Sequence, residues 1–117
     1  MVFINVALAT ICFNGACYPA LVGNDTPKGT FQLTQMPINE KRQPGYGTDV
    51  LKFKENDTEW WAIHRVWLLK PEQRRMERLN SGNVEDRTHV TAGCVNVMPE
   101  VYEKLKSCCS SDKLTIE

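Results

Sequence analysis

A cysteine and a histidine are the two residues of this chain whose types suggest covalent chemistry. Cys94 lies in the segment Thr91–Asn96, which reads Thr-Ala-Gly-Cys-Val-Asn, and His64 ends an apolar stretch that begins at Trp60. A thiol attacks as a thiolate, so it needs a base or a positive charge nearby, and N–H donors must face the oxyanion formed from a carbonyl. The amides of Gly93 and Cys94 are candidate donors, because glycine lets the backbone approach a substrate closely. The residues alone leave open a buried structural cysteine and a hydrogen-bonded core histidine.

The composition limits the classes of function to consider. With 117 residues, of which 42% are hydrophobic, the chain is long enough for one core, and we expect a single domain over residues 1–117. Lysine and arginine together number 14, as do aspartate and glutamate, so no net charge attracts nucleic acid, and no nucleic-acid partner is expected. No stretch reaches the roughly 20 apolar residues of a spanning helix, so no integral membrane segment is expected.

The apolar stretch Val2–Phe13 is not typical of a signal peptide. No lysine or arginine precedes it, and Asn5 interrupts it. A β-hairpin is the better interpretation, because Asn14-Gly15 favours the positive φ angles of a tight turn and joins the strand-like segments Thr10–Phe13 and Ala16–Tyr18.

The remaining elements are predicted from alternation and turn residues. Further strands are expected over residues 30–34, 49–54, 59–67 and 114–116, with a surface loop over 37–48. Helices are expected over residues 71–80 and 99–106, because each segment begins with proline followed by glutamate. The predicted fold class is therefore mainly β with two short helices.

The five cysteines do not suggest a metal site. There is no Cys-x-x-Cys pair and there are only two histidines, so neither a metal nor another cofactor is expected. A two-residue turn would place Cys12 and Cys17 opposite each other, either as a disulfide or as two free thiols, depending on the compartment. Cys108 and Cys109 are adjacent at a helix end, and no role is predicted for them.

Three segments together resemble a known enzyme family. Thr91–Asn96 resembles the Ser/Thr-His-Gly-Cys-aliphatic-Asn signature of the L,D-transpeptidases, the YkuD-type cysteine enzymes that cross-link peptidoglycan. Asn24–Phe31 resembles the family's Thr-Pro-x-Gly-x-Phe segment, and Trp61–His64 resembles the strand that ends in its catalytic histidine. The resemblance spans roughly residues 8 to 116 and implies a YkuD-like β-sandwich.

Two differences from the family pattern indicate a variant subgroup. Ala92 stands where the family has a histidine before glycine, and His89, three residues upstream, is a candidate replacement. The interval between His64 and Thr91 is longer than the family's usual spacing and contains the arginine-rich helical segment.

The resemblance also implies a mechanism. His64 accepts the proton of Cys94 and is oriented by the backbone carbonyl of Arg65, while the Gly93 and Cys94 amides hold the oxyanion. Cys94 attacks the third-position diamino acid of a peptidoglycan stem tetrapeptide, releases D-alanine and forms a thioester. An amine of a second stem then gives a cross-link, whereas water makes the enzyme a carboxypeptidase.

The same resemblance implies a location and leaves two rival functions. Because the substrate lies outside the cytoplasm, a periplasmic or cell-envelope location is expected. The rivals are a wall-targeting effector of the same fold and a non-catalytic peptidoglycan-binding module.

The residues that would contact the substrate are less sharply defined. Thr91 and Asn96 match motif positions and either bind peptide or brace the loop. Arg78 and Arg87 are candidates for stem-peptide carboxylates, and Arg74 is placed on the same helix face as Arg78; the alternative is a solvated face paired with glutamates. Of Trp60 and Trp61, which alternate across a strand, one is expected in the core and the other in the wall of a cleft.

Overall fold

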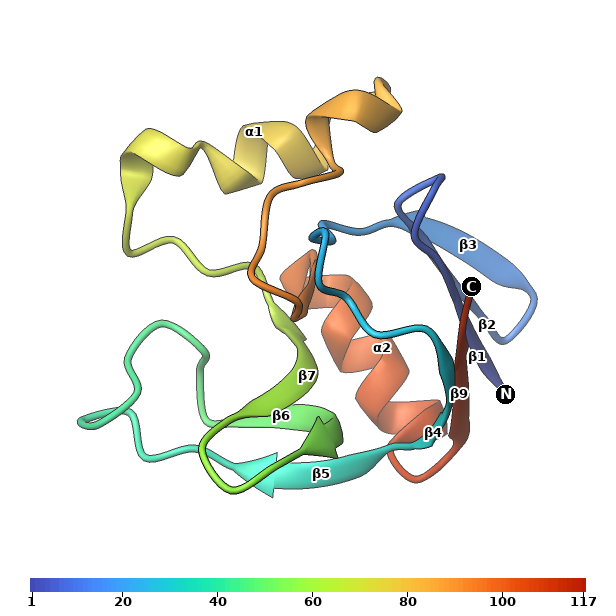
Figure 1. Cartoon of the computed structure of the whole chain (residues 1–117), viewed down its shortest axis with the longest axis vertical. Helices are drawn as coiled ribbons and strands as arrows, with labels where there is room; N and C mark the ends of the chain where they lie inside the picture. Colours follow the sequence, from blue (N-terminus) through green and yellow to red (C-terminus); the bar gives the residue numbers. More distant parts are fainter.

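Nine strands form two β-sheets, and the computed structural model describes residues 1–117 (Figure 1). The first sheet has the order β3-β2-β1-β9-β4 and consists of β1 (Val2–Asn5), β2 (Thr10–Phe13), β3 (Ala16–Pro19), β4 (Gly29–Gln32) and β9 (Lys113–Ile116). The second has the order β5-β6-β7-β8 and consists of β5 (Thr34–Pro37), β6 (Asp49–Glu55), β7 (Trp60–Arg65) and β8 (Val95–Val97). The mainly β fold predicted from the sequence is confirmed.

The two sheets bury their apolar side chains against each other. In β1, Val2 and Ile4 are buried while Phe3 between them is 47% exposed, as the alternation of a strand with one buried face requires. The chain passes from the first sheet to the second at Leu33, which is buried between β4 and β5. This change of sheet explains why one predicted strand over 30–34 is two strands in the structure.

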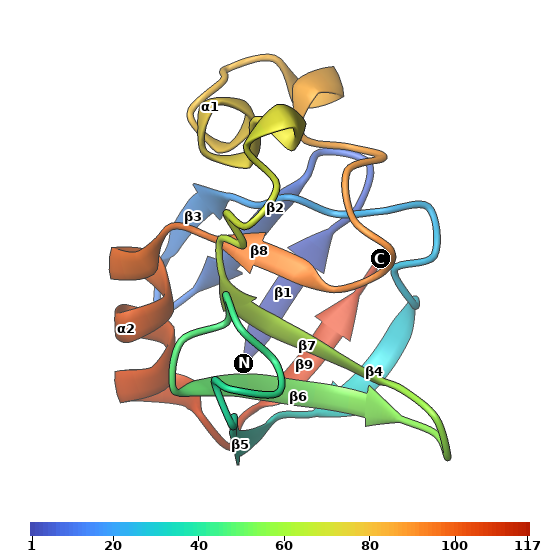
Figure 2. The same ribbon diagram turned by 90° about the vertical axis from the view of Figure 1, so that its left-hand side faces the viewer.

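Helix α2 (Pro99–Cys109) lies alongside both sheets, at the left in Figure 2. Its buried residues Val101, Tyr102 and Leu105 recur at helical spacing and join the main core. The other helix, α1 (Arg75–Leu79), is short and packs Leu79 against Leu21 and Val66 in a second, smaller cluster. Neither helix combines the length and the apolar character needed to cross a membrane.

The segment before α1 differs from the single predicted helix over 71–80. A 3₁₀ turn, η1 (Pro71–Gln73), is followed by Arg74 with a φ of 53°, and α1 begins only at Arg75. A left-handed residue cannot continue a right-handed helix, so the segment is divided there. A second 3₁₀ turn, η2 (Val84–Asp86), precedes the cysteine motif.

The N-terminal hairpin has the predicted turn. Asn14 and Gly15 have φ angles of 52° and 82°, and Cys12 is paired with Cys17 and bonded to it as a disulfide. Cys108 and Cys109, adjacent residues in the last turn of α2 for which no role was predicted, are also joined as a disulfide. Cys94 is therefore the one free cysteine.

Candidate active site

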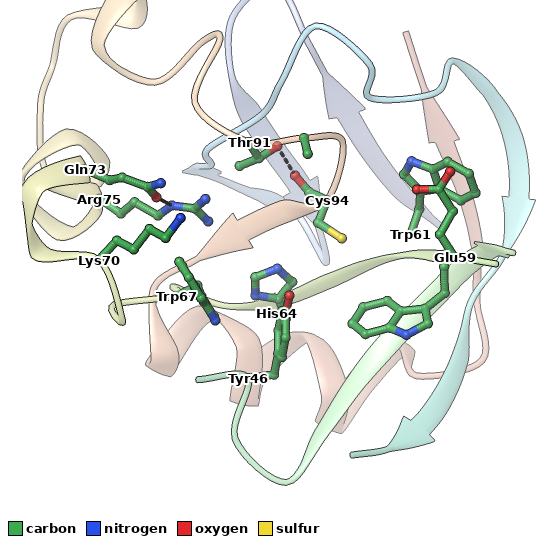
Figure 3. A pocket seen from close by; sticks show the side chains of 12 residues that line it. Tyr46, Glu59, Trp61, His64, Trp67, Lys70, Gln73, Arg75, Thr91 and Cys94 are labelled. Carbon is green, nitrogen blue, oxygen red and sulfur yellow. Dashed lines mark hydrogen bonds between the residues drawn. The ribbon is translucent and has the colours of Figure 1, made fainter. Parts of the chain in front are cut away.

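Parallel pairing of β7 and β8 brings Cys94 and His64 into the same cavity. His64 of β7 is in register with Asn96 of β8, and Cys94 directly precedes β8. Both residues line a cavity of about 300 Å³. Figure 3 shows the thiol and the imidazole pointing into it, the imidazole from β7 and the thiol from the loop directly before β8. Two residues that are 30 positions apart in the sequence are thus neighbours because of a single strand pairing.

His64 is held in one tautomer. Its Nδ1 lies 2.7 Å from the backbone oxygen of Arg65, and because a carbonyl only accepts, we assign the proton to Nδ1. Nε2 then carries a lone pair, and the amide nitrogen of Asn96 lies 3.5 Å from it. Burial lowers the pKa of His64 to about 4; the hydrogen bond to Arg65 opposes this shift and the charge of Arg75 adds to it. His64 is therefore a neutral acceptor at pH 7.

The thiol of Cys94 is also neutral at pH 7. Burial raises its pKa, and this effect outweighs the opposing backbone hydrogen bond from Ala62 and the positive charge of Arg75. Glu59 adds to the rise. The site consequently holds a thiol beside a neutral imidazole, an arrangement suited to proton transfer during attack rather than to a preformed thiolate.

The loop that presents Cys94 is fixed by Thr91 and two glycines. The hydroxyl of Thr91 donates to the Cys94 oxygen at 2.6 Å and accepts from the Gly93 amide at 3.1 Å. Gly93 has a φ of 136°, and a Cβ there would lie 2.7 Å from the indole nitrogen of Trp61. At Gly23 a Cβ would lie 1.9 Å from the backbone oxygen of Thr91, so this contact between two loops requires glycine.

These contacts change the roles predicted for Gly93 and Thr91. The Gly93 amide is already used by the Thr91 hydroxyl, so of the two predicted oxyanion donors only the Cys94 amide remains. Thr91 lines the cavity, yet its hydroxyl is occupied within the loop. Its geometry is that of a brace.

Asn96 is a buried connector and does not line the cavity. It is fully buried, and its Oδ1 accepts from the backbone nitrogen of Trp67 and from Nη1 of Arg75, each at 3.0 Å. Its amide nitrogen is the group that faces His64 Nε2. Of the two roles left open for Asn96, bracing is the one that this geometry supports.

The structure places Arg78 and Arg87 away from the cavity, contrary to the prediction that they contact the substrate. Arg87 is buried, and its guanidinium binds the backbone oxygens of Leu8, Ala9 and Ser81, which ties the motif-proximal loop to the β1–β2 turn. Arg78 donates to the backbone oxygens of Gln73 and Asp86. Both guanidinium groups are used to hold loops.

Arg74 and His89 also differ from their predicted positions. Arg74 precedes α1, so it does not share a helix face with Arg78, and it pairs with Glu77 at 2.6 Å. His89 contacts Asn24 and lines a different cavity. Ala92, which stands where the family has a histidine, lines the cavity of Cys94. His89 does not line that cavity and therefore does not replace the missing histidine.

Both Trp60 and Trp61 line the cavity, and Trp61 also packs against the main core, so the expected division between core and cleft wall is only partly right.

Several other cavity residues were not predicted from the sequence. These residues are Glu59 directly before β7, Tyr46 in the loop before β6, and Trp67, Lys70, Gln73 and Arg75 between the end of β7 and the first residue of α1. The ring of Tyr46 lies 4.7 Å from that of His64, centroid to centroid.

Comparisons with known proteins identify the fold. No protein-family model matches the sequence, and no curated protein matches it. Among solved structures, the chain is similar to an L,D-transpeptidase from Mycobacterium smegmatis, with 18% identity and a TM-score of 0.61 over 99% of this chain and 57% of that one. It is also similar to an L,D-transpeptidase (Yku) from Stackebrandtia nassauensis, with 15% identity and a TM-score of 0.58 over 99% of this chain and 54% of that one.

A third similar structure is the L,D-transpeptidase LdtMt1 in complex with imipenem, with 14% identity and a TM-score of 0.60 over 99% of this chain and 57% of that one. The chain thus spans a little over half the length of each of these structures. Its two sheets and two helices have the L,D-transpeptidase fold.

Proposed function

We propose that this protein is a cysteine-dependent L,D-transpeptidase that acts on peptidoglycan stem peptides. The observation that carries the proposal is the convergence of Cys94 and His64 in one cavity, with His64 Nδ1 bonded to Arg65. Cys94 is the nucleophile and Nε2 of His64 is the base, because Nδ1 is occupied by the Arg65 carbonyl. The L,D-transpeptidase fold supports this choice of substrate, and stem peptides place the activity at the cell envelope.

The acylation step follows from the neutral thiol–imidazole pair. As Cys94 Sγ attacks the carbonyl carbon of the third-position diamino acid, its proton passes to His64 Nε2. The amide of Cys94 donates to the oxyanion, and the imidazolium returns the proton to the nitrogen of the departing D-alanine. The products are a Cys94 thioester and free D-alanine.

The acceptor determines how the thioester is resolved. An amine of a second stem peptide attacks the thioester carbonyl and loses its proton to His64, which gives an amide cross-link and restores the thiol. A D-amino acid gives exchange by the same path, and water gives carboxypeptidase activity. We propose cross-linking or exchange as the main reaction, with hydrolysis as the alternative.

The proposal is tested by turnover of a synthetic stem tetrapeptide. The wild-type protein is incubated with the tetrapeptide alone and with an added D-amino acid, and products are separated by mass. We expect D-alanine release with cross-linked or exchanged peptide, and none of these with Cys94→Ser. If Cys94→Ser binds peptidoglycan as tightly as the wild type and neither protein yields product, the chain is a binding module.

A further inference from the structure

Arg75 is a partly buried cation without an anionic partner. None of the ion pairs in the structure includes it. Its Nε donates to the side-chain oxygen of Gln73 at 2.8 Å and its Nη1 to that of Asn96 at 3.0 Å, and both acceptors are uncharged. Withdrawing a guanidinium from water without an opposite charge is costly, so the position favours binding of an anion.

The unpaired charge faces the nucleophile. Arg75 lines the cavity together with Cys94, and Figure 3 shows Lys70, Gln73 and Arg75 entering from one side while Glu59 and Trp61 stand on the other. Glu59 is the one carboxylate in the lining. Lys70 forms no ion pair either, which leaves two free cations on the same side.

Arg75 is also held in place before any ligand arrives. The side chains of Gln73 and Asn96 fix two edges of its guanidinium, and its carbon Cζ lies 5.2 Å from the ring centroid of Trp67. The remaining donors are left for a ligand, and a planar fork of N–H groups matches the two oxygens of a carboxylate. Little conformational entropy is then lost on binding.

We propose that Arg75, assisted by Lys70, binds a carboxylate of the substrate beside the carbonyl that Cys94 attacks. This inference rests on the proposed function, in which the fitting group is the free α-carboxylate of the departing C-terminal residue. The site would thereby select peptides that end one residue beyond the scissile carbonyl and reject longer or amidated ones. A bound carboxylate also offsets the charge of Arg75, which makes His64 a stronger base when substrate is present.

The first test needs no peptide. Second-order rate constants for alkylation of Cys94 by iodoacetate and by neutral iodoacetamide are measured by intact mass, and their ratio is formed for each protein. Both reagents require the same thiolate, so any change in the pKa of Cys94 cancels in the ratio. We expect Arg75→Gln to lower the iodoacetate-to-iodoacetamide ratio at least about fivefold, because one attracting charge is lost. Arg75→Lys, which keeps the positive charge, should retain most of the wild-type ratio.

Arg74→Gln is the matched control. It removes one positive charge from the same segment, but Arg74 pairs with Glu77 and does not line the cavity, so its ratio should stay within about twofold of the wild type. In the wild type, the ratio should also fall with added salt, a readout that requires no variant. An unchanged ratio in folded Arg75→Gln together with no salt dependence overturns the proposal.

The second test separates this inference from the proposed function. A stem tetrapeptide with a free C-terminal carboxylate is compared with its C-terminal amide, and kcat/KM is expected to favour the acid at least about tenfold in the wild type and much less in Arg75→Gln. If the tetrapeptide is processed with no such preference, the carboxylate site is wrong while the enzyme stands. If the alkylation ratio responds to Arg75 but no peptide is processed, the carboxylate site stands and the transpeptidase is wrong.

Discussion

His64 Nδ1 lies 2.7 Å from the carbonyl oxygen of Arg65, the residue that follows it in the chain. The contact depends on local backbone geometry at the end of β7, and it commits Nε2 to the side of the ring that faces Asn96 and the cavity. One backbone oxygen therefore decides which nitrogen of the imidazole serves as the base.

The pH dependence of acylation should reveal a buried histidine. Burial lowers the pKa of His64 to about 4, and protonation of Nε2 removes the base. The rate of acylation of Cys94 by imipenem should therefore fall as pH decreases through about 4 and show no step near the ordinary histidine value of about 6.5. Stopped-flow absorbance measures the rate. A midpoint near the ordinary value would contradict the environment assigned to His64.

The same shift predicts how stability depends on pH. The folded-state pKa of His64 lies below that of the unfolded chain, so the unfolded state binds more protons between about pH 6.5 and 4. As pH decreases through that window, the free energy of unfolding of the wild type should fall by about 3 kcal/mol. His64→Gln should not show this loss. Urea titrations at several pH values measure it.

Asp49 provides an internal control for that experiment. Burial raises its pKa, but hydrogen bonds from Arg65 and Lys106 outweigh burial and lower it overall. Its contribution to stability is therefore present above the unfolded-state pKa and is lost only as pH falls below it. Wild type and His64→Gln should share this lower-pH loss. An equal loss in both proteins between about pH 6.5 and 4 would exclude His64 as its source.

Gly23→Ala should displace the loop that carries the nucleophile. A Cβ at Gly23 would lie 1.9 Å from the Thr91 oxygen, which is backbone and cannot move aside independently. We expect a loss of about 2–4 kcal/mol in the free energy of unfolding and slower acylation of Cys94. Gly82→Ala is the control, because a Cβ there meets no atom within 4 Å. Equal stability of the two variants would be inconsistent with this packing.

Asn96→Ala should destabilise the protein through unpaired neighbours. The change leaves the partly buried backbone nitrogen of Trp67 and one edge of the Arg75 guanidinium without their acceptor. The expected loss is about 2–4 kcal/mol in urea unfolding. Asn80→Ala should cost about 0.5 kcal/mol or less, since the exposed Asn80 amide bonds only to the Met76 oxygen. A neutral Asn96→Ala would contradict the bracing role assigned to Asn96.

The sequence predicts the elements with strong local signals. The Asn14-Gly15 turn, the strands that contain residues 49–54 and 114–116, and the start of α2 at Pro99 all depend on local preferences that tertiary contacts reinforce. Strand β8 is not predicted, because its three residues, Val95–Val97, are too few to give a periodic signal.

The candidate site is predicted only where its residues belong to a motif. Cys94 and His64 are found in this way, whereas Tyr46 lies on a loop and Arg75 on a helical segment that matches no motif, so nothing in the sequence assigns them to the site. Arg87, by contrast, is predicted to contact the substrate but does not line the cavity. Its position near the motif suggests substrate binding, but only the structure reveals that Leu8 and Ala9 supply its acceptors from the far end of the chain.

Intact-mass analysis after incubation with imipenem tests the central claim most directly, namely that Cys94 is a reactive acyl acceptor activated by His64. Because Cys94 is the one free cysteine, we predict a single covalent adduct on the wild type, mapped to Cys94 by peptide digestion. We predict none on Cys94→Ala, and a rate lowered about 100-fold or more on His64→Gln. A folded wild-type protein that carries no adduct at several-fold excess of imipenem would contradict the claim.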